Sequence, residues 1–156
     1  MALTLDDFIG SIHKSRKHFL KHVHGLSDEQ LDWKTYAECK SIRETVAHLI
    51  CDDRAALQAL QTGGEPDYES LQESERDWHK LLATLETSHS ELCAYLARTL
   101  AGKPLDDEVC IFGGKYKMAI GIPYISSEDF YHAGQVAFIR MATDPSWDYY
   151  SAIYAE

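Results

Sequence analysis

Glu128 and His132 are the first residues whose types and spacing suggest chemistry. They are four positions apart, so on a helix their side chains lie one turn apart on the same face. The apolar neighbours Val136 and Ile139 predict that this face points into the protein, where an unpaired carboxylate is costly to desolvate. A metal cation held by Glu128 and His132 would remove that cost.

His48 is the best candidate for a third ligand. It is followed by Leu49 and Ile50 in another segment of helical period, which places it beside the apolar stripe of that segment. Two imidazoles and one carboxylate suit zinc or nickel and leave coordination positions open for water. The spacing also fits a surface pair or a hydrogen-bonded core histidine, and the residues alone leave these alternatives open.

Three further residues are candidates for supporting roles. Gln135 continues the helix face of His132 and could hydrogen-bond a ligand or a bound water. Asp52 lies one turn after His48 and is a candidate partner of that histidine, with a solvated carboxylate as the alternative. Gly134 costs about 1 kcal/mol relative to alanine inside a helix, which predicts that a neighbouring helix approaches closely there.

Four segments with a helical period must position these residues. They run from Thr4 to His24, from the capping box at Ser41 to the Gly63-Gly64 break, from Leu71 to Leu100, and from Ser126 or Ser127 to Thr143. A capping box at Ser27 predicts one short extra turn, and the aromatic tail over residues 147–154 predicts a last short helix.

Residues 103–124 interrupt the helical pattern. Apolar residues on both sides of Gly113-Gly114 indicate a β-hairpin or an irregular extended segment. The sequence therefore predicts an all-α fold, a four-helix bundle with a long crossover between helices three and four and a small β-hairpin within it. With 156 residues and 45% hydrophobic content, we expect a single domain over residues 1–156.

Composition excludes several classes of function. The 25 acidic and 15 basic residues give a net charge of −10, which would repel a nucleic acid backbone. There is no apolar run of about 20 residues and no signal peptide pattern, so we expect a cytoplasmic protein with no membrane or nucleic acid partner. The four cysteines show no close pairing and are predicted to be buried thiols, not disulfides or a cysteine zinc site.

The densest basic region is in the first predicted helix. Four basic residues, Lys14, Arg16, Lys17 and Lys21, are interleaved with His13, His18, His22 and His24. This pattern predicts a solvated polar face that includes some hydrogen-bonded histidines.

Two strings resemble motifs of the DinB/YfiT-like superfamily of metal-binding four-helix bundles. They are Ser-Ile-Arg-Glu-Thr-Val-Ala-His-Leu-Ile at residues 41–50 and Tyr-His-Ala-Gly-Gln-Val-Ala-Phe-Ile-Arg at residues 131–140, and the resemblance covers nearly the whole chain in order and spacing. In that family the first string carries a metal-ligating histidine, and the second follows His-x-x-x-His-x-Gly-Gln. His48 and His132 match these ligands.

Glu128 departs from the resembled pattern, because the family has a histidine at that position. Glutamate is a competent ligand, and its charge would make bound water less acidic than an all-histidine site would. The resemblance therefore implies a retained metal site with altered reactivity, with a degenerate site that binds metal weakly as the alternative.

The resemblance also implies a function. It indicates a divalent-metal-dependent enzyme, of the thiol S-transferase or hydrolase type, that acts on a small molecule such as a low-molecular-weight thiol and forms a homodimer. The ion would activate a bound water or a substrate thiol, and Glu128 or Asp129, if free of metal, could act as a base. The alternative is a non-catalytic, metal-stabilised dimeric bundle with a stress-related binding role.

Overall fold

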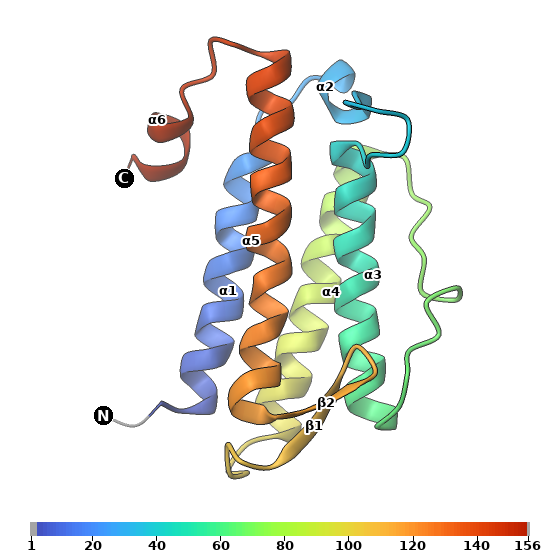
Figure 1. The fold of residues 1–156 in the computed structure, drawn as a ribbon, viewed down its shortest axis with the longest axis vertical. Coiled ribbons are helices and arrows are strands. Elements are labelled where there is room, and N and C mark those ends of the chain that lie inside the picture. Colours follow the sequence, from blue (N-terminus) through green and yellow to red (C-terminus); the bar gives the residue numbers. More distant parts are fainter. Residues whose placement is uncertain (1–2, 156) are drawn as a thin grey trace.

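Four long helices, α1, α3, α4 and α5, form the body of the protein, as Figure 1 illustrates. The computed structural model describes residues 3–155. Its elements are α1 (Leu5–His22), α2 (Asp28–Asp32), α3 (Ile42–Thr62), α4 (Trp78–Thr99), β1 (Glu108–Ile111), β2 (Gly114–Lys117), α5 (Met118–Thr143) and α6 (Tyr149–Tyr154). The prediction of a helical bundle with a small hairpin in its crossover is confirmed.

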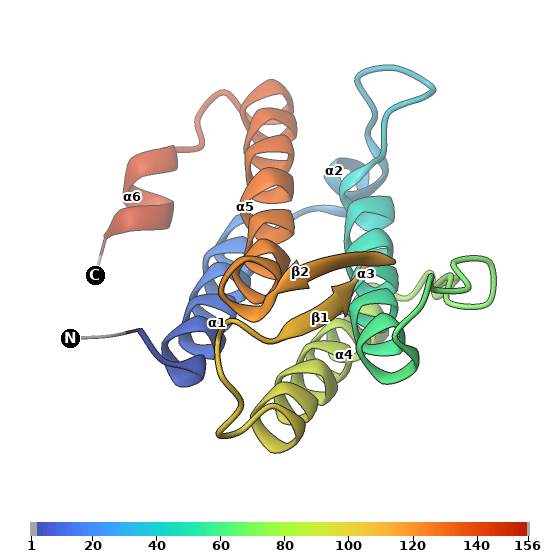
Figure 2. The same cartoon turned by 60° about the horizontal axis from the view of Figure 1, so that its bottom comes forward.

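The arrangement of the long helices defines two opposite grooves. Helix α1 packs beside α5 and α3 beside α4, while α1 also contacts α4 and α3 contacts α5 (Figures 1 and 2). The α1–α4 groove and the α3–α5 groove therefore lie on opposite sides of the bundle. Within residues 3–155, no helix combines the length and the apolar character needed to cross a bilayer.

Several predicted helix ends are confirmed by their capping geometry. Thr4, Ser27 and Ser41 each accept a hydrogen bond from the backbone three residues later, and in each case that residue's side chain bonds back to the cap. These reciprocal bonds satisfy amides that the helix itself leaves free. At the end of α3, Gly63 takes φ +71°, a left-handed conformation that glycine adopts without strain.

Helix α4 begins at Trp78, seven residues after the predicted start at Leu71. The carboxylate of Glu73 accepts hydrogen bonds from the amides of residues 74 and 75, and that of Glu75 accepts from residues 76 and 77. Acidic side chains that bond nearby amides compete with helix formation. Asp77 then caps the helix by accepting from the amide of Lys80.

Helix α5 begins at Met118 and contains Pro123, so the predicted start at Ser126 or Ser127 is wrong. Both serine hydroxyls donate to carbonyls three residues earlier and act as interior helix residues. The first amides of α5, at Met118 and Ala119, donate to carbonyls in the preceding segment at residues 107 and 105. These tertiary bonds replace the side-chain cap that a sequence pattern would reveal.

The hairpin covers the lower ends of the helices in Figure 1. Strands β1 and β2 are antiparallel, with Ile111 paired to Gly114. The two residues between them, Phe112 and Gly113, both have positive φ, at 52° and 83°, as a two-residue type I′ turn requires. Ile111 is fully buried against Met118 and the first turns of α5, so the hairpin closes this end of the core.

Candidate metal centre

His132 is a buried imidazole on α5 with a defined hydrogen-bond partner. The residue is 3% exposed, and its Nδ1 lies 2.8 Å from Oε1 of Gln135. An amide oxygen can only accept, so Nδ1 carries the proton and donates it. The lone pair of Nε2 is thereby left for another partner, the arrangement found in metal-bound histidines.

His48 and Asp52 face the same point from α3. Nε2 of His48 lies 3.3 Å from Oδ2 of Asp52, and the rings of His48 and His132 are 5.0 Å apart at an interplanar angle of 84°. One donor atom from each of His48, Asp52 and His132 falls within 4.8 Å of the other two. Two nitrogens and a carboxylate oxygen thus converge, a donor set that suits zinc and related divalent ions.

One of these donor atoms is buried without a hydrogen bond. Oδ2 of Asp52 has no hydrogen-bond partner among the residues that the structure describes, despite its approach to His48. An unsatisfied buried acceptor is costly, and a cation between Asp52 and the two imidazoles would satisfy it. The residues present therefore fit a divalent metal ion.

The protonation of the cluster follows from its burial. Burial, aided by the neighbouring His132, lowers the pKa of His48 to about 4, and burial also lowers the pKa of His132. Both imidazoles are neutral at pH 7 and can donate lone pairs. Burial, with the nearby carboxylates of Glu128 and Asp53, raises the pKa of Asp52 to about 7, and the charges of Lys40 and Arg16 offset only part of this effect.

The structure also brings Glu128 to the cluster. Its Oε2 lies 3.8 Å from Nε2 of His132, and its side chain lines the same pocket as His48. The three residues predicted as ligands are therefore neighbours. Asp52, which the sequence suggested for a supporting role, is one of the three residues whose donor atoms converge, and Oε1 of Gln135 lies within hydrogen-bond distance of His132.

A pocket of about 700 Å³ lies beside the cluster. It is lined by His48, Glu128, His132 and Gln135, and also by Tyr36, Cys39, Lys40, Tyr131, Gly134 and Phe138. The prediction that a helix packs closely on Gly134 is wrong, since a Cβ at this position would meet nothing within 4 Å. The missing side chain instead leaves space at the pocket wall.

Asp129, the next residue after Glu128, is not available as a base. Its carboxylate accepts from Nε of Arg16 at 2.8 Å and from the hydroxyl of Ser15 at 2.9 Å. Arg16 also binds both oxygens of Asp53 at 3.0 Å. Arg16 is only 5% exposed, so its predicted place on a solvated basic face is wrong, and it instead links α1, α3 and α5 inside the core.

Comparison with known families supports the interpretation of these motifs. A family model described as the DinB superfamily matches residues 11–136, which include His48 and His132. The chain belongs to the DinB superfamily. No curated protein matches the sequence.

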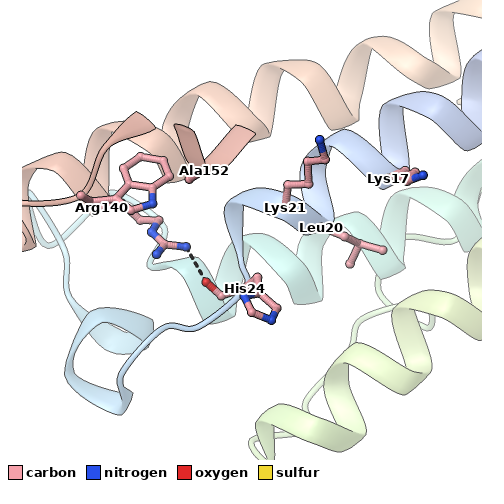
Figure 3. Close-up of a pocket in the computed structure, with 7 residues that line it drawn as sticks. Lys17, Leu20, Lys21, His24, Arg140 and Ala152 are labelled. Carbon is pink, nitrogen blue, oxygen red and sulfur yellow. Dashed lines mark hydrogen bonds between the residues drawn. The ribbon is translucent and has the colours of Figure 1, made fainter. Parts of the chain in front are cut away.

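A second pocket of this DinB superfamily protein lies between α1, α5 and α6 (Figure 3). It measures about 450 Å³, and Lys17, Lys21 and His24 are among its lining residues. The guanidinium of Arg140 donates to the carbonyl of His24, as drawn in Figure 3, and to that of His22. These bonds satisfy carbonyls at the end of α1, so Arg140 has a structural role in the DinB bundle.

The cysteines are free thiols, as predicted. Cys51, Cys93 and Cys110 are buried, which the sequence indicated. Cys39 is exposed and lies at the pocket above the candidate metal centre, so for this residue the prediction of a buried thiol is wrong. It belongs to the loop before α3, which the core does not cover.

Proposed function

We propose that this DinB superfamily protein is a divalent-metal-dependent enzyme that acts on a small molecule. The observation that carries the proposal is the buried, unpartnered Oδ2 of Asp52, which faces two neutral imidazoles. His48 and His132 of this cluster line an open pocket of about 700 Å³, the size of a small-molecule site. Ligands that line such a pocket support a reactive site more than a closed structural one.

The ion would be held by the imidazoles of His48 and His132 and the carboxylate of Asp52, with Glu128 as a further oxygen donor. Nitrogen and oxygen donors without thiolate favour zinc or nickel. When bound, such an ion lowers the pKa of a coordinated water or thiol, which is the chemistry that a hydrolase or a thiol S-transferase needs.

The remaining pocket residues have roles that follow from their chemistry. Gln135 holds the proton of His132 on Nδ1 and so keeps Nε2 directed at the site. Lys40 is the cationic side chain of the pocket wall and would bind an anionic group of the substrate. Tyr131 and Phe138, on α5, add aromatic surface to the same pocket. A small thiol that carries a carboxylate fits these requirements.

Glu128 has two roles open to it within this proposal. Its carboxylate is close enough to His132 to act as a ligand, and it also lines the pocket, where it could accept a proton from a substrate. Asp129 is excluded from the second role by its ion pair with Arg16.

Metal analysis of single variants tests the proposal. The protein is stripped with a chelator, reloaded with zinc or nickel, and desalted before the metal is counted. We expect His132→Ala and His48→Ala to bind one equivalent less than the wild type, while the exposed His79→Ala, on α4, serves as the matched control. Unchanged metal content in His132→Ala would rule out this centre.

Activity decides between the enzyme and the non-catalytic dimer. The loaded protein is assayed against a panel of small thiols with electrophilic acceptors and against ester and amide substrates. We expect turnover with at least one class and its loss in His132→Ala. A large fall in melting temperature on chelation without turnover of any substrate would favour the metal-stabilised, homodimeric alternative.

A further inference from the structure

A second cluster of metal-ligand side chains lies on the other side of the bundle. His13 on α1 meets His89 and Cys93 on α4, and one donor atom from each falls within 4.8 Å of the other two. This is the α1–α4 groove, opposite the α3–α5 groove that holds His48 and His132. The two clusters share no residue.

The spacing of the donor atoms is close to that of a tetrahedral site. Nδ1 of His13 lies 3.0 Å from Nε2 of His89, and Sγ of Cys93 lies 3.8 Å from the same nitrogen. With metal–nitrogen bonds of about 2.0 Å and metal–sulfur bonds of about 2.3 Å, a tetrahedral zinc ion separates its ligands by roughly 3.3 Å for two nitrogens and roughly 3.6 Å for nitrogen and sulfur. Shifts of a few tenths of an ångström would bring these two separations to those values, and the third pair of donor atoms, on His13 and Cys93, lies within 4.8 Å.

A single hydrogen bond does not engage both contacts of Nε2 of His89. A neutral imidazole nitrogen has either one proton or one lone pair, and this atom faces both Nδ1 of His13 and Sγ of Cys93. A cation between them would accept a lone pair from each of the three converging atoms at once.

The cluster is open to a cation from one side. His89 and Cys93 are 7% and 4% exposed, while His13 is exposed, so this side faces solvent and leaves room for a water ligand. Ser88, the residue before His89, donates to Asp53, which connects this stretch of α4 to the buried ion network of Arg16, Asp53 and Asp129.

We propose that His13, His89 and Cys93 form a second metal site, which binds a zinc ion with a water as the fourth ligand. Binding replaces the thiol proton of Cys93, which is released to solvent, by a sulfur–zinc bond. The bound ion joins α1 to α4, two helices that are far apart in sequence. The proposal is independent of the function proposed for the α3–α5 centre.

Cobalt(II) tests this site without interference from the first centre, because only a thiolate ligand produces a sulfur-to-cobalt charge-transfer absorption. The starting protein is the full chain with His48→Ala and His132→Ala. We expect it to bind one cobalt ion with this absorption and to lose the absorption on addition of one equivalent of zinc. Absence of the absorption in the folded protein would overturn the proposal.

Further substitutions in the same background assign the sulfur. Cys93→Ser should abolish the absorption, and Cys39→Ser, a matched change at the exposed cysteine, should preserve it. His13→Asn changes only the exposed ligand and should weaken cobalt binding at least about tenfold, with an unchanged circular dichroism spectrum that shows an intact fold. An absorption that survives Cys93→Ser, or wild-type affinity in a folded His13→Asn variant, would overturn the proposal.

Discussion

Gln135 accepts a hydrogen bond of 2.8 Å from Nδ1 of His132 and thereby fixes the tautomer of that histidine. We expect Gln135→Leu to lower metal affinity at the α3–α5 centre by about 10- to 100-fold, as is typical when the support of a ligand is removed. Competition with a coloured chelator measures the affinity. Gln135→Glu retains a hydrogen-bond acceptor, so its metal affinity should remain close to that of the wild type. Equal losses of metal affinity in both variants would show that Gln135 acts through packing.

Arg16 is the cationic centre of the buried ion network, and its removal should strongly destabilise the fold. Arg16→Met leaves Asp53 and Asp129 uncompensated, which costs about 3–5 kcal/mol for a buried pair. Urea unfolding of the wild type and of Arg16→Met measures the difference in their free energies of unfolding. As a control, Arg76→Ala breaks an exposed pair with Asp32 and should cost at most about 1 kcal/mol. A combined Arg16→Met, Asp53→Asn and Asp129→Asn variant should recover part of the loss.

Two glycines of α5 should respond in opposite directions to the same substitution. Gly134→Ala adds a methyl group in open space and should raise stability by about 0.5–1 kcal/mol. At Gly121 the new Cβ would lie 3.0 Å from Cβ of Tyr116 and 3.1 Å from Cγ1 of Ile111, so Gly121→Ala should lower stability by about 1–3 kcal/mol. Thermal melts compare the two, and a loss of stability in Gly134→Ala would contradict this account of the pocket wall.

His22 should make the fold sensitive to acid. Burial lowers the pKa of His22 below its ordinary value of 6.5, so below that pH the unfolded chain takes up a proton that the folded protein excludes. Stability from this residue is therefore present above pH 6.5 and is lost as the pH falls. His22→Phe should flatten the pH dependence of unfolding between pH 7 and 5 by up to about 1.4 kcal/mol per pH unit. Parallel curves of unfolding free energy against pH for the wild type and His22→Phe would contradict this assignment.

Much of the fold could be predicted from the sequence, because its signals are local. The capping boxes at Thr4, Ser27 and Ser41, and the glycine at position 63, depend on neighbouring residues only. The start of α5 could not be predicted in this way. Its first amides are satisfied by carbonyls at residues 105 and 107, and such tertiary partners leave no pattern at the helix itself.

The candidate centre was partly predictable for the same reason. Glu128 and His132, like His48 and Asp52, are pairs four residues apart on a helix, so spacing alone places each pair on one face. Which carboxylate lies closest to both imidazoles depends on how α3 and α5 are rotated against each other, and that is set by packing between distant segments. The cluster of His13, His89 and Cys93 depends in the same way on the contact between α1 and α4.

Acidic residues in adjacent pairs connect the candidate centre to the core. Asp52 and Glu128 lie at the candidate centre, while the next residues, Asp53 and Asp129, are both bound to Arg16. The network thus sets the rotation of both helices without using Asp52 or Glu128. Substitutions at Asp52 or Glu128 can therefore alter the chemistry of the site while its scaffold stays in place, and the glutamate at position 128, where the resembled pattern has histidine, is a change of this kind.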